Sequence, residues 1–243
     1  YLSVYTEAWP RLTEAGFPFT LFVASSPIDR KLSGYMSWEQ IRELQSSGVT
    51  IGSQTHTHPH MHRLSDEEVR AEISTSNGRF IEELGLRPEL FAYPYGEYSQ
   101  FVIDAVKNAG FRAAFGQNSG IMHSADDQFQ LPRFAFNEAY GTIDRLKLAV
   151  DGLPLKVHDL TPEDMVLTMN PPLYGFTVSE EMSPVSQLRC FSNNHGKLDV
   201  TMLGMRAEIR APGPLTEPRA RINCTMPAVD GRWRWFGRQF LTR

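Results

Sequence analysis

The chain has 243 residues, of which 41% are hydrophobic, and a formal net charge of −4. This length and composition suffice for a buried core in one large domain or two smaller ones. No lysine- or arginine-rich run occurs, and no apolar run approaches the roughly 18 residues of a membrane helix. We therefore expect neither a nucleic-acid-binding surface nor a membrane span.

Helix and strand patterns alternate over the first 150 residues. Capping boxes at Ser37 and Ser65 each predict the start of a helix, and two further helices are predicted at residues 3–15 and 98–109. Short apolar runs between them predict buried strands at residues 17–24, 49–52, 90–93 and 111–115. This alternation predicts an α/β fold with a parallel sheet or barrel.

The pattern changes after about residue 155. Proline becomes frequent, the helical period disappears, and short alternating segments separated by turn residues follow. These features are typical of an antiparallel β-sandwich. We place the boundary at residues 155–160 and predict one domain over residues 1–155 and a second over residues 160–243.

The two cysteines, Cys190 and Cys224, both lie in strand-like segments. A disulfide between two strands would indicate an oxidising compartment. Two reduced and buried thiols are the alternative.

Four of the seven histidines stand at alternate positions from 56 to 62, directly after the predicted strand at 49–52. Imidazole is a common metal ligand and a common general acid or base. The alternatives are a polar loop whose imidazoles bond to backbone carbonyls and a zinc-binding loop of structural use. Because the histidines cluster at the end of a strand, we favour a functional site.

A Pro-Tyr-Gly sequence, residues 94–96, follows the predicted strand at 90–93. Alone it indicates only a turn between a strand and a helix. Together with the histidine loop, it indicates a second loop with functional residues at the same edge of the sheet.

The two loops together resemble motifs of the polysaccharide deacetylases, the NodB-homology or carbohydrate esterase family 4 group. The family pattern His-Ser/Thr-x-x-His-Pro is similar to residues 54–59, QTHTHP, and Arg-x-Pro-Tyr-Gly is similar to residues 92–96, AYPYG. The resemblance covers roughly residues 1–150. It implies a distorted (β/α) barrel with a divalent metal, commonly zinc, that removes acetyl groups from a polysaccharide.

Roles follow from this resemblance position by position. His58 is the expected metal ligand, with Gln54 and His56 as further candidates, and Thr55 supports the ligand loop. The backbone N–H of Tyr95 is expected to stabilise the oxyanion. Pro94 and Tyr95 are expected to line the pocket for the acetyl group.

The sequence also departs from the family pattern. The opening Thr-Phe-Asp-Asp-Gly motif is absent, so we expect the chain to lack the first strand of the barrel. Gln54 stands where the family has a histidine, and Ala92 stands where it has an arginine; Arg133 is a candidate replacement for that arginine. His158 is the candidate for the catalytic acid, which the family takes from a late Leu-x-His sequence.

Two functions are therefore expected. The first is metal-dependent hydrolysis of N-acetyl or O-acetyl groups on a cell-envelope or extracellular glycan, in the periplasm or outside the cell. The alternative is a catalytically impaired relative that binds carbohydrate. In the last predicted strand, Trp233 and Trp235 share one face and either stack on sugar rings or belong to the core.

Overall fold

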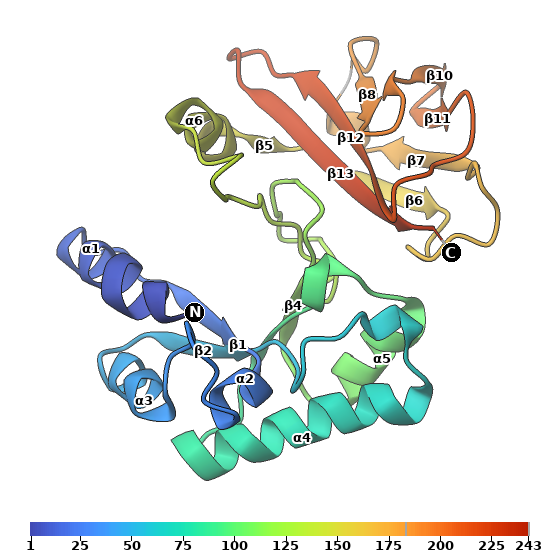
Figure 1. The fold of residues 1–243 in the computed structure, drawn as a ribbon. Coiled ribbons are helices and arrows are strands. Elements are labelled where there is room, and N and C mark those ends of the chain that lie inside the picture. Colours follow the sequence, from blue (N-terminus) through green and yellow to red (C-terminus); the bar gives the residue numbers. More distant parts are fainter. Residues whose placement is uncertain (183, 243) are drawn as a thin grey trace. The chain divides into compact units, whose positions relative to one another are not determined.

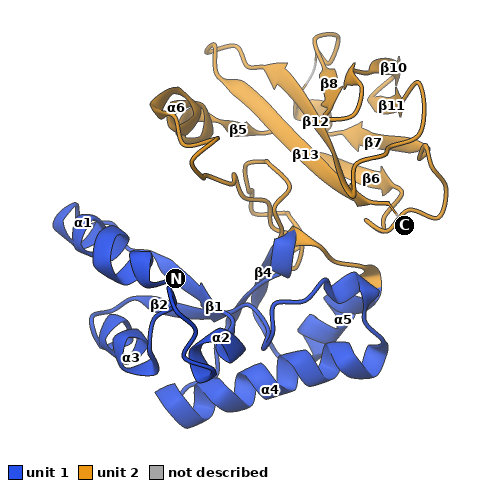
Figure 2. Cartoon of the chain, in the orientation of Figure 1, with its two compact units in different colours: residues 1–95, 101–115 blue, residues 96–100, 116–243 orange. Residues whose placement is uncertain are grey.

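The computed structural model describes residues 1–182 and 184–242, and the chain forms two compact units. Figure 2 distinguishes the first unit, residues 1–95 and 101–115, from the second, which holds residues 96–100 and the chain from residue 116 onward. None of the helices in the described ranges has the length and apolar character needed to cross a membrane.

The first unit is an α/β unit built on four parallel strands (Figure 1). The strands pair in the order β1-β2-β3-β4, so that consecutive strands along the chain are neighbours in the sheet. They are β1 (Thr20–Val23), β2 (Thr50–Ser53), β3 (Leu90–Ala92) and β4 (Ala113–Phe115). Parallel pairing places the carboxyl ends of β2 and β3 at the same edge of the sheet, where the two candidate loops begin.

Helices precede the first of these strands and connect each strand to the next. They are η1 (Val4–Ala8), α1 (Trp9–Glu14), α2 (Ser25–Asp29), α3 (Trp38–Ser46), η2 (Met61–Arg63), α4 (Asp66–Leu84), η3 (Pro94–Gly96) and α5 (Gln100–Asn108). Both predicted capping boxes are confirmed: the Ser37 hydroxyl accepts the N–H of Gln40, and the Ser65 hydroxyl accepts the N–H of Glu68. Each cap provides an acceptor for a backbone N–H of the first helical turn that has no partner within the helix.

The predicted helix at residues 3–15 is divided in the structure. Its first half is the π-helical segment η1, and α1 begins at Trp9 with Pro10 in its first turn. Proline has no backbone N–H to continue the preceding helical bonds, which explains why a new helical segment begins here.

The second unit contains two sheets around a common hydrophobic core. One sheet has the order β10-β11-β7-β6 and the other has the order β5-β13-β12-β8-β9. Core side chains come from both sheets, among them Phe176 and Ile209 from the first and Ile222 and Phe240 from the second. The strands are β5 (Leu153–Pro154), β6 (Val157–Thr161), β7 (Tyr174–Val178), β8 (Arg189–Ser192), β9 (Gly196–Lys197), β10 (Asp199–Leu203), β11 (Arg206–Arg210), β12 (Arg219–Pro227) and β13 (Trp233–Leu241).

A disulfide joins Cys190 and Cys224 in this unit. The two residues lie directly opposite each other on the antiparallel strands β8 and β12, and both are fully buried. The interpretation of the cysteines as a disulfide between strands is confirmed.

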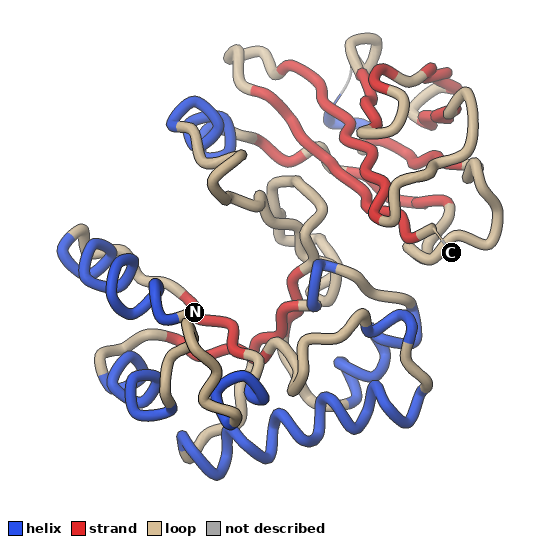
Figure 3. The backbone as a smooth tube through the Cα atoms, viewed as in Figure 1, coloured by secondary structure: helices blue, strands red, loops and turns tan. Residues whose placement is uncertain are grey.

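The division into units differs from the predicted domain boundary at residues 155–160. Residues 116–142 run as loops and turns, followed by α6 (Ile143–Asp151) (Figure 3). These residues group with the second unit (Figure 2). The reason is a set of contacts with β13: Gly120 bridges to Phe236, and the Asn118 amide donates to the carbonyl of Gly237 at 3.2 Å. The sequence pattern of residues 116–152 carries no sign of these contacts, because they join segments more than 100 positions apart.

Candidate functional site

The histidine loop begins where β2 ends and is fixed to the neighbouring strand at its first residue. The N–H of Gln54 donates to the carbonyl of Val23 at 2.8 Å, which extends the pairing of β1 and β2 by one bond. The His56 ring turns toward α2, where its Nδ1 lies 2.8 Å from the buried hydroxyl of Ser25. Gln54 and His58 are both half-buried and line the same cavity.

Residues 55–58 form a tight turn with two unusual backbone conformations. Thr55 has φ of 67° and His58 has φ of 62°, in the left-handed region that non-glycine residues rarely adopt. Each such residue costs on the order of 1–3 kcal/mol unless surrounding contacts compensate. One compensating contact is internal: the N–H of His58 donates to Oγ1 of Thr55 at 3.0 Å. This contact agrees with the supporting role that the resemblance implies for Thr55.

The Pro-Tyr-Gly turn brings Tyr95 against the histidines. Tyr95 also has a left-handed backbone, with φ of 57° and ψ of 7°. Its ring stacks on the His60 ring at a centroid distance of 4.2 Å, and the His58 ring meets it edge-on at 4.6 Å. The two loops predicted to share one edge of the sheet are therefore in direct contact.

A cavity of about 410 Å³ opens beside these residues within the first unit. Its polar wall holds Gln54, Thr57, His58 and Tyr95, and much of the remainder is apolar, from β1 and the chain around α2. A concave apolar surface with a few convergent polar groups is typical of a ligand site.

The side chains around the cavity offer fewer donors than a zinc site needs. Zinc in catalytic sites takes three protein ligands, usually from His, Asp, Glu or Cys. Within residues 1–182 and 184–242, no group of three such side chains surrounds a common point. Gln54 offers an amide oxygen, a poor zinc ligand, and the His56 ring is engaged with Ser25. The described residues therefore do not make up a complete zinc centre.

The two remaining candidates, Arg133 and His158, both lie in the second unit. Nε of Arg133 donates to the carbonyl of Gly116 at 2.6 Å, and burial lowers the pKa of the Arg133 guanidinium. His158 is exposed on β6, with its Nε2 at 3.6 Å from a carboxylate oxygen of Asp159. Their predicted roles, as replacement arginine and catalytic acid, stay predictions.

Several residues that bind the histidine loop were not identified from the sequence. Ser25 on α2 and Glu72 and Ser76 on α4 all bond to residues 55–57. A serine that begins a helix and a glutamate within one are common for other reasons, so no local pattern identifies them. The spacing of Glu72 and Ser76, four residues apart on one helical face, is the single signal available.

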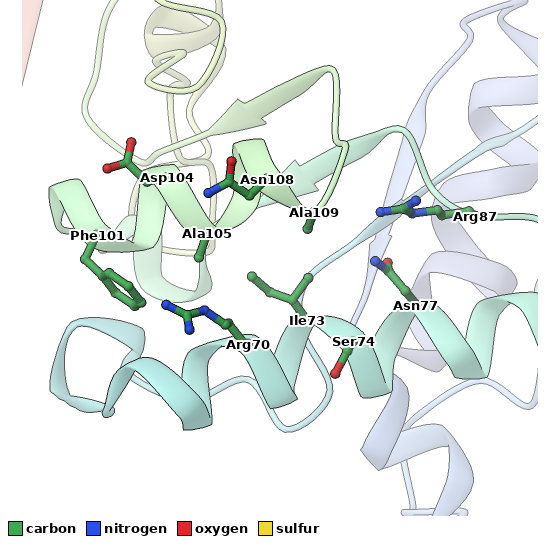
Figure 4. Close-up of a pocket in the computed structure, with 10 residues that line it drawn as sticks. All are labelled: Arg70, Ile73, Ser74, Asn77, Arg87, Phe101, Asp104, Ala105, Asn108 and Ala109. Atoms are coloured by element: carbon green, nitrogen blue, oxygen red, sulfur yellow. The ribbon is translucent and has the colours of Figure 1, made fainter.

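A second cavity of the first unit, of about 320 Å³, lies between α4 and α5 (Figure 4). The Arg70 guanidinium lies over the Phe101 ring at 5.4 Å from its centroid. Asn77 on α4 is buried, and its side-chain oxygen has no hydrogen-bond partner in the described structure. The histidine loop lines the other cavity, so this one is separate from the candidate site.

The histidine loop and the Pro-Tyr-Gly turn follow neighbouring strands and lie beside one cavity. Residues 1–114 match the family model described as polysaccharide deacetylase. Residues 1–114 are thus similar to the polysaccharide deacetylase family, which confirms the resemblance.

One curated relative shows the same similarity. The chain is 23% identical over 133 residues to the putative polysaccharide deacetylase YxkH of Bacillus subtilis, covering 55% of this chain and 47% of YxkH. The chain therefore spans about half the length of this curated relative.

Solved structures show the same fold. The Streptococcus pyogenes deacetylase PplD, in complex with acetate, superposes with a TM-score of 0.57 at 19% identity, over 61% of this chain and 65% of PplD. IcaB from Ammonifex degensii superposes with a TM-score of 0.53 at 25% identity, over 61% of this chain and 67% of IcaB. The first unit is accordingly an α/β fold of the NodB type.

Proposed function

We propose that this protein takes part in hydrolysing acetyl groups, N-acetyl or O-acetyl, from an acetylated polysaccharide of the cell envelope or extracellular space. The observation that carries the proposal is the contact of His58 with Tyr95 beside the 410 Å³ cavity. In the family pattern these positions hold the second histidine of the metal motif and the tyrosine of Pro-Tyr-Gly. The similarity of residues 1–114 to the polysaccharide deacetylase family supports the reaction class.

The roles of the residues follow from the chemistry of acetyl hydrolysis. The carbonyl oxygen gains negative charge when water adds to the acetyl carbon, and a fixed backbone N–H stabilises that charge. We assign this donation to the N–H of Tyr95, because its backbone is held in a left-handed turn. Pro94 and Tyr95 would contact the acetyl methyl group. His58 would be the first ligand of the zinc ion that the resemblance implies.

The test is acetate release from partially acetylated glucosamine oligomers. Wild-type protein and His58→Ala are compared before and after treatment with a chelator and return of zinc. His195→Ala serves as the control, because this imidazole belongs to the second unit, where its Nε2 lies 3.0 Å from the Pro214 carbonyl. Release by wild type and by the control, but not by His58→Ala, would support the proposal. Equal release by all three would overturn the assignment of His58.

A second function is favoured by a specific observation. Gln54 and Ala92 replace the histidine and the arginine of the family pattern, and the described donors do not fit a zinc centre. A catalytically impaired relative that binds carbohydrate would explain both. Binding of acetylated oligomers without acetate release, measured by calorimetry on the same preparation, would favour this function.

We propose a periplasmic or extracellular location, and the Cys190–Cys224 disulfide supports it. Disulfides persist in oxidising compartments and are rare in the reducing cytosol of mesophiles. Acid quenching of cells, followed by alkylation of the denatured protein, tests this point: a chain that takes up label only after reduction carries the disulfide in its native compartment.

A further inference from the structure

One carboxylate that lies outside the histidine loop binds the turn that presents His58. Glu72 lies on α4, and both of its carboxylate oxygens accept hydrogen bonds from the loop. Oε2 accepts the backbone N–H of His56 at 3.0 Å and that of Thr57 at 2.7 Å. Oε1 accepts the hydroxyl of Thr57 at 2.6 Å.

The same helical face makes a second attachment one turn later. The hydroxyl of Ser76 donates to the carbonyl of Thr55 at 3.1 Å and lies 3.2 Å from the hydroxyl of Ser53. Residues four apart on a helix share a face, so Glu72 and Ser76 act on consecutive parts of one loop. A third attachment comes from α2, where the N–H of Ser26 donates to the carbonyl of His56 at 2.9 Å.

These attachments matter because the turn is otherwise unfavourable. Thr55 and His58 both have positive φ, and threonine is β-branched, which makes this backbone conformation especially rare. Two consecutive N–H groups that converge on one carboxylate oxygen fix the orientation of the peptide units between those residues. The peptide units at His56 and Thr57 set the direction in which the chain enters His58.

We propose that Glu72 is a positioning residue for the deacetylase site. It holds the turn at residues 55–58 so that the His58 ring lies against Tyr95 at the cavity. Its effect on rate rests on the proposed function, whereas its effect on the His58 ring position does not. Misplacement by about 1 Å can lower an enzymatic rate on the order of 100-fold.

The experiment compares Glu72→Ala, Glu72→Gln and Glu67→Gln. Glutamine retains an oxygen for the two backbone donors and offers an amide N–H to the Thr57 hydroxyl, so Glu72→Gln is the conservative rescue. Glu67 is an exposed glutamate in the first turn of α4 and controls for loss of one negative charge. Thr57→Val removes only the hydroxyl donor from an exposed residue and covers the case in which Glu72→Ala fails to fold.

Two readouts are taken for each variant. The first is the histidine side-chain NMR spectrum, in which the His58 resonances report the ring-current field of Tyr95. The second is the separation of kcat from KM for acetate release. We expect Glu72→Ala to move the His58 resonances and to lower kcat on the order of 100-fold, with a smaller change in KM. Thr57→Val should move the same resonances in the same direction by less, and Glu72→Gln and Glu67→Gln should resemble wild type.

The outcomes separate the two proposals. His58 resonances that stay in place in a folded Glu72→Ala or in Thr57→Val would overturn the positioning role. Equal loss of activity in Glu72→Ala and Glu67→Gln would overturn it as well, because charge alone would then account for the effect. If wild-type protein releases no acetate while Glu72→Ala still moves the His58 resonances, the deacetylase function fails and the positioning role stands.

Discussion

The rings of His60 and Tyr95 stack with a centroid distance of 4.2 Å and an interplanar angle of 13°, although they come from loops after two different strands. This contact and the edge-on contact of His58 pack the histidine loop against the Pro-Tyr-Gly turn. Substitution of a ring in the stack is therefore expected to affect the site even where the residue does not touch substrate.

His60→Ala removes the stack, and we expect kcat/KM for acetate release to fall by about 2- to 10-fold. Aromatic pairs of this kind contribute about 0.5–1.5 kcal/mol beyond their buried area, which sets this range. His60→Phe keeps a ring at the position and should retain most of the activity. Equal kinetics for His60→Ala and wild type would show that Tyr95 is held without the stack.

Gln54→His restores the residue of the family pattern at a position that lines the cavity with His58. Imidazole is a much better zinc ligand than an amide oxygen. We expect zinc affinity, measured by calorimetry, to rise by at least about tenfold, since a single ligand gain of 1.4 kcal/mol already gives that factor. The double variant with His58→Ala should lose the gain; if it does not, the added histidine binds zinc elsewhere.

The sequence predicted the strands and helices of the first unit well because each has a local signal. Capping boxes mark the starts of α3 and α4, and the short apolar runs mark the buried strands. The five-residue helix α2 was missed, since a single helical turn has too few positions for a periodic pattern. The division of the first predicted helix at Pro10 was also missed, although proline is the signal for it.

The candidate site was predictable only in part. The positions of the histidine loop and of Tyr95 follow from the strands before them, and the structure brings them into contact. The contacts of Ser25 and Glu72 with His56 depend on how α2 and α4 pack beside the loop. These two residues lie 31 and 16 positions from His56 in the sequence. Packing at such separations is not encoded in any short motif.

Removing the disulfide by Cys190→Ala with Cys224→Ala is expected to lower the free energy of unfolding of the second unit by about 2–4 kcal/mol. The bridge closes a loop between positions 34 apart and is buried between β8 and β12. Guanidinium unfolding followed by circular dichroism measures the change. Wild-type protein unfolded in the presence of a reductant should approach the double variant, and a variant as stable as the oxidised wild type would contradict the expectation.

Tyr174→Phe is expected to stabilise the second unit. The Tyr174 ring is buried against Phe240 at a centroid distance of 5.2 Å, and its hydroxyl has no hydrogen-bond partner in the described structure. A buried hydroxyl without a partner costs about 1–3 kcal/mol. Phenylalanine keeps the ring contact and removes that cost, so the free energy of unfolding should rise by about 1 kcal/mol at neutral pH.

The same substitution should change the response to alkaline pH. Burial raises the pKa of the Tyr174 hydroxyl above its usual value, so the folded state keeps a proton that the unfolded state releases. The contribution of this raised pKa to the free energy of unfolding is fully present below the unfolded pKa of about 10 and is lost as the pH rises above that value. Unfolding of wild type at pH 8 to 11 should thus show a steeper loss of stability than unfolding of Tyr174→Phe. Tyr140→Phe alters an exposed tyrosine and should retain the wild-type slope; a slope in Tyr174→Phe equal to that of wild type would assign the alkaline loss to other groups.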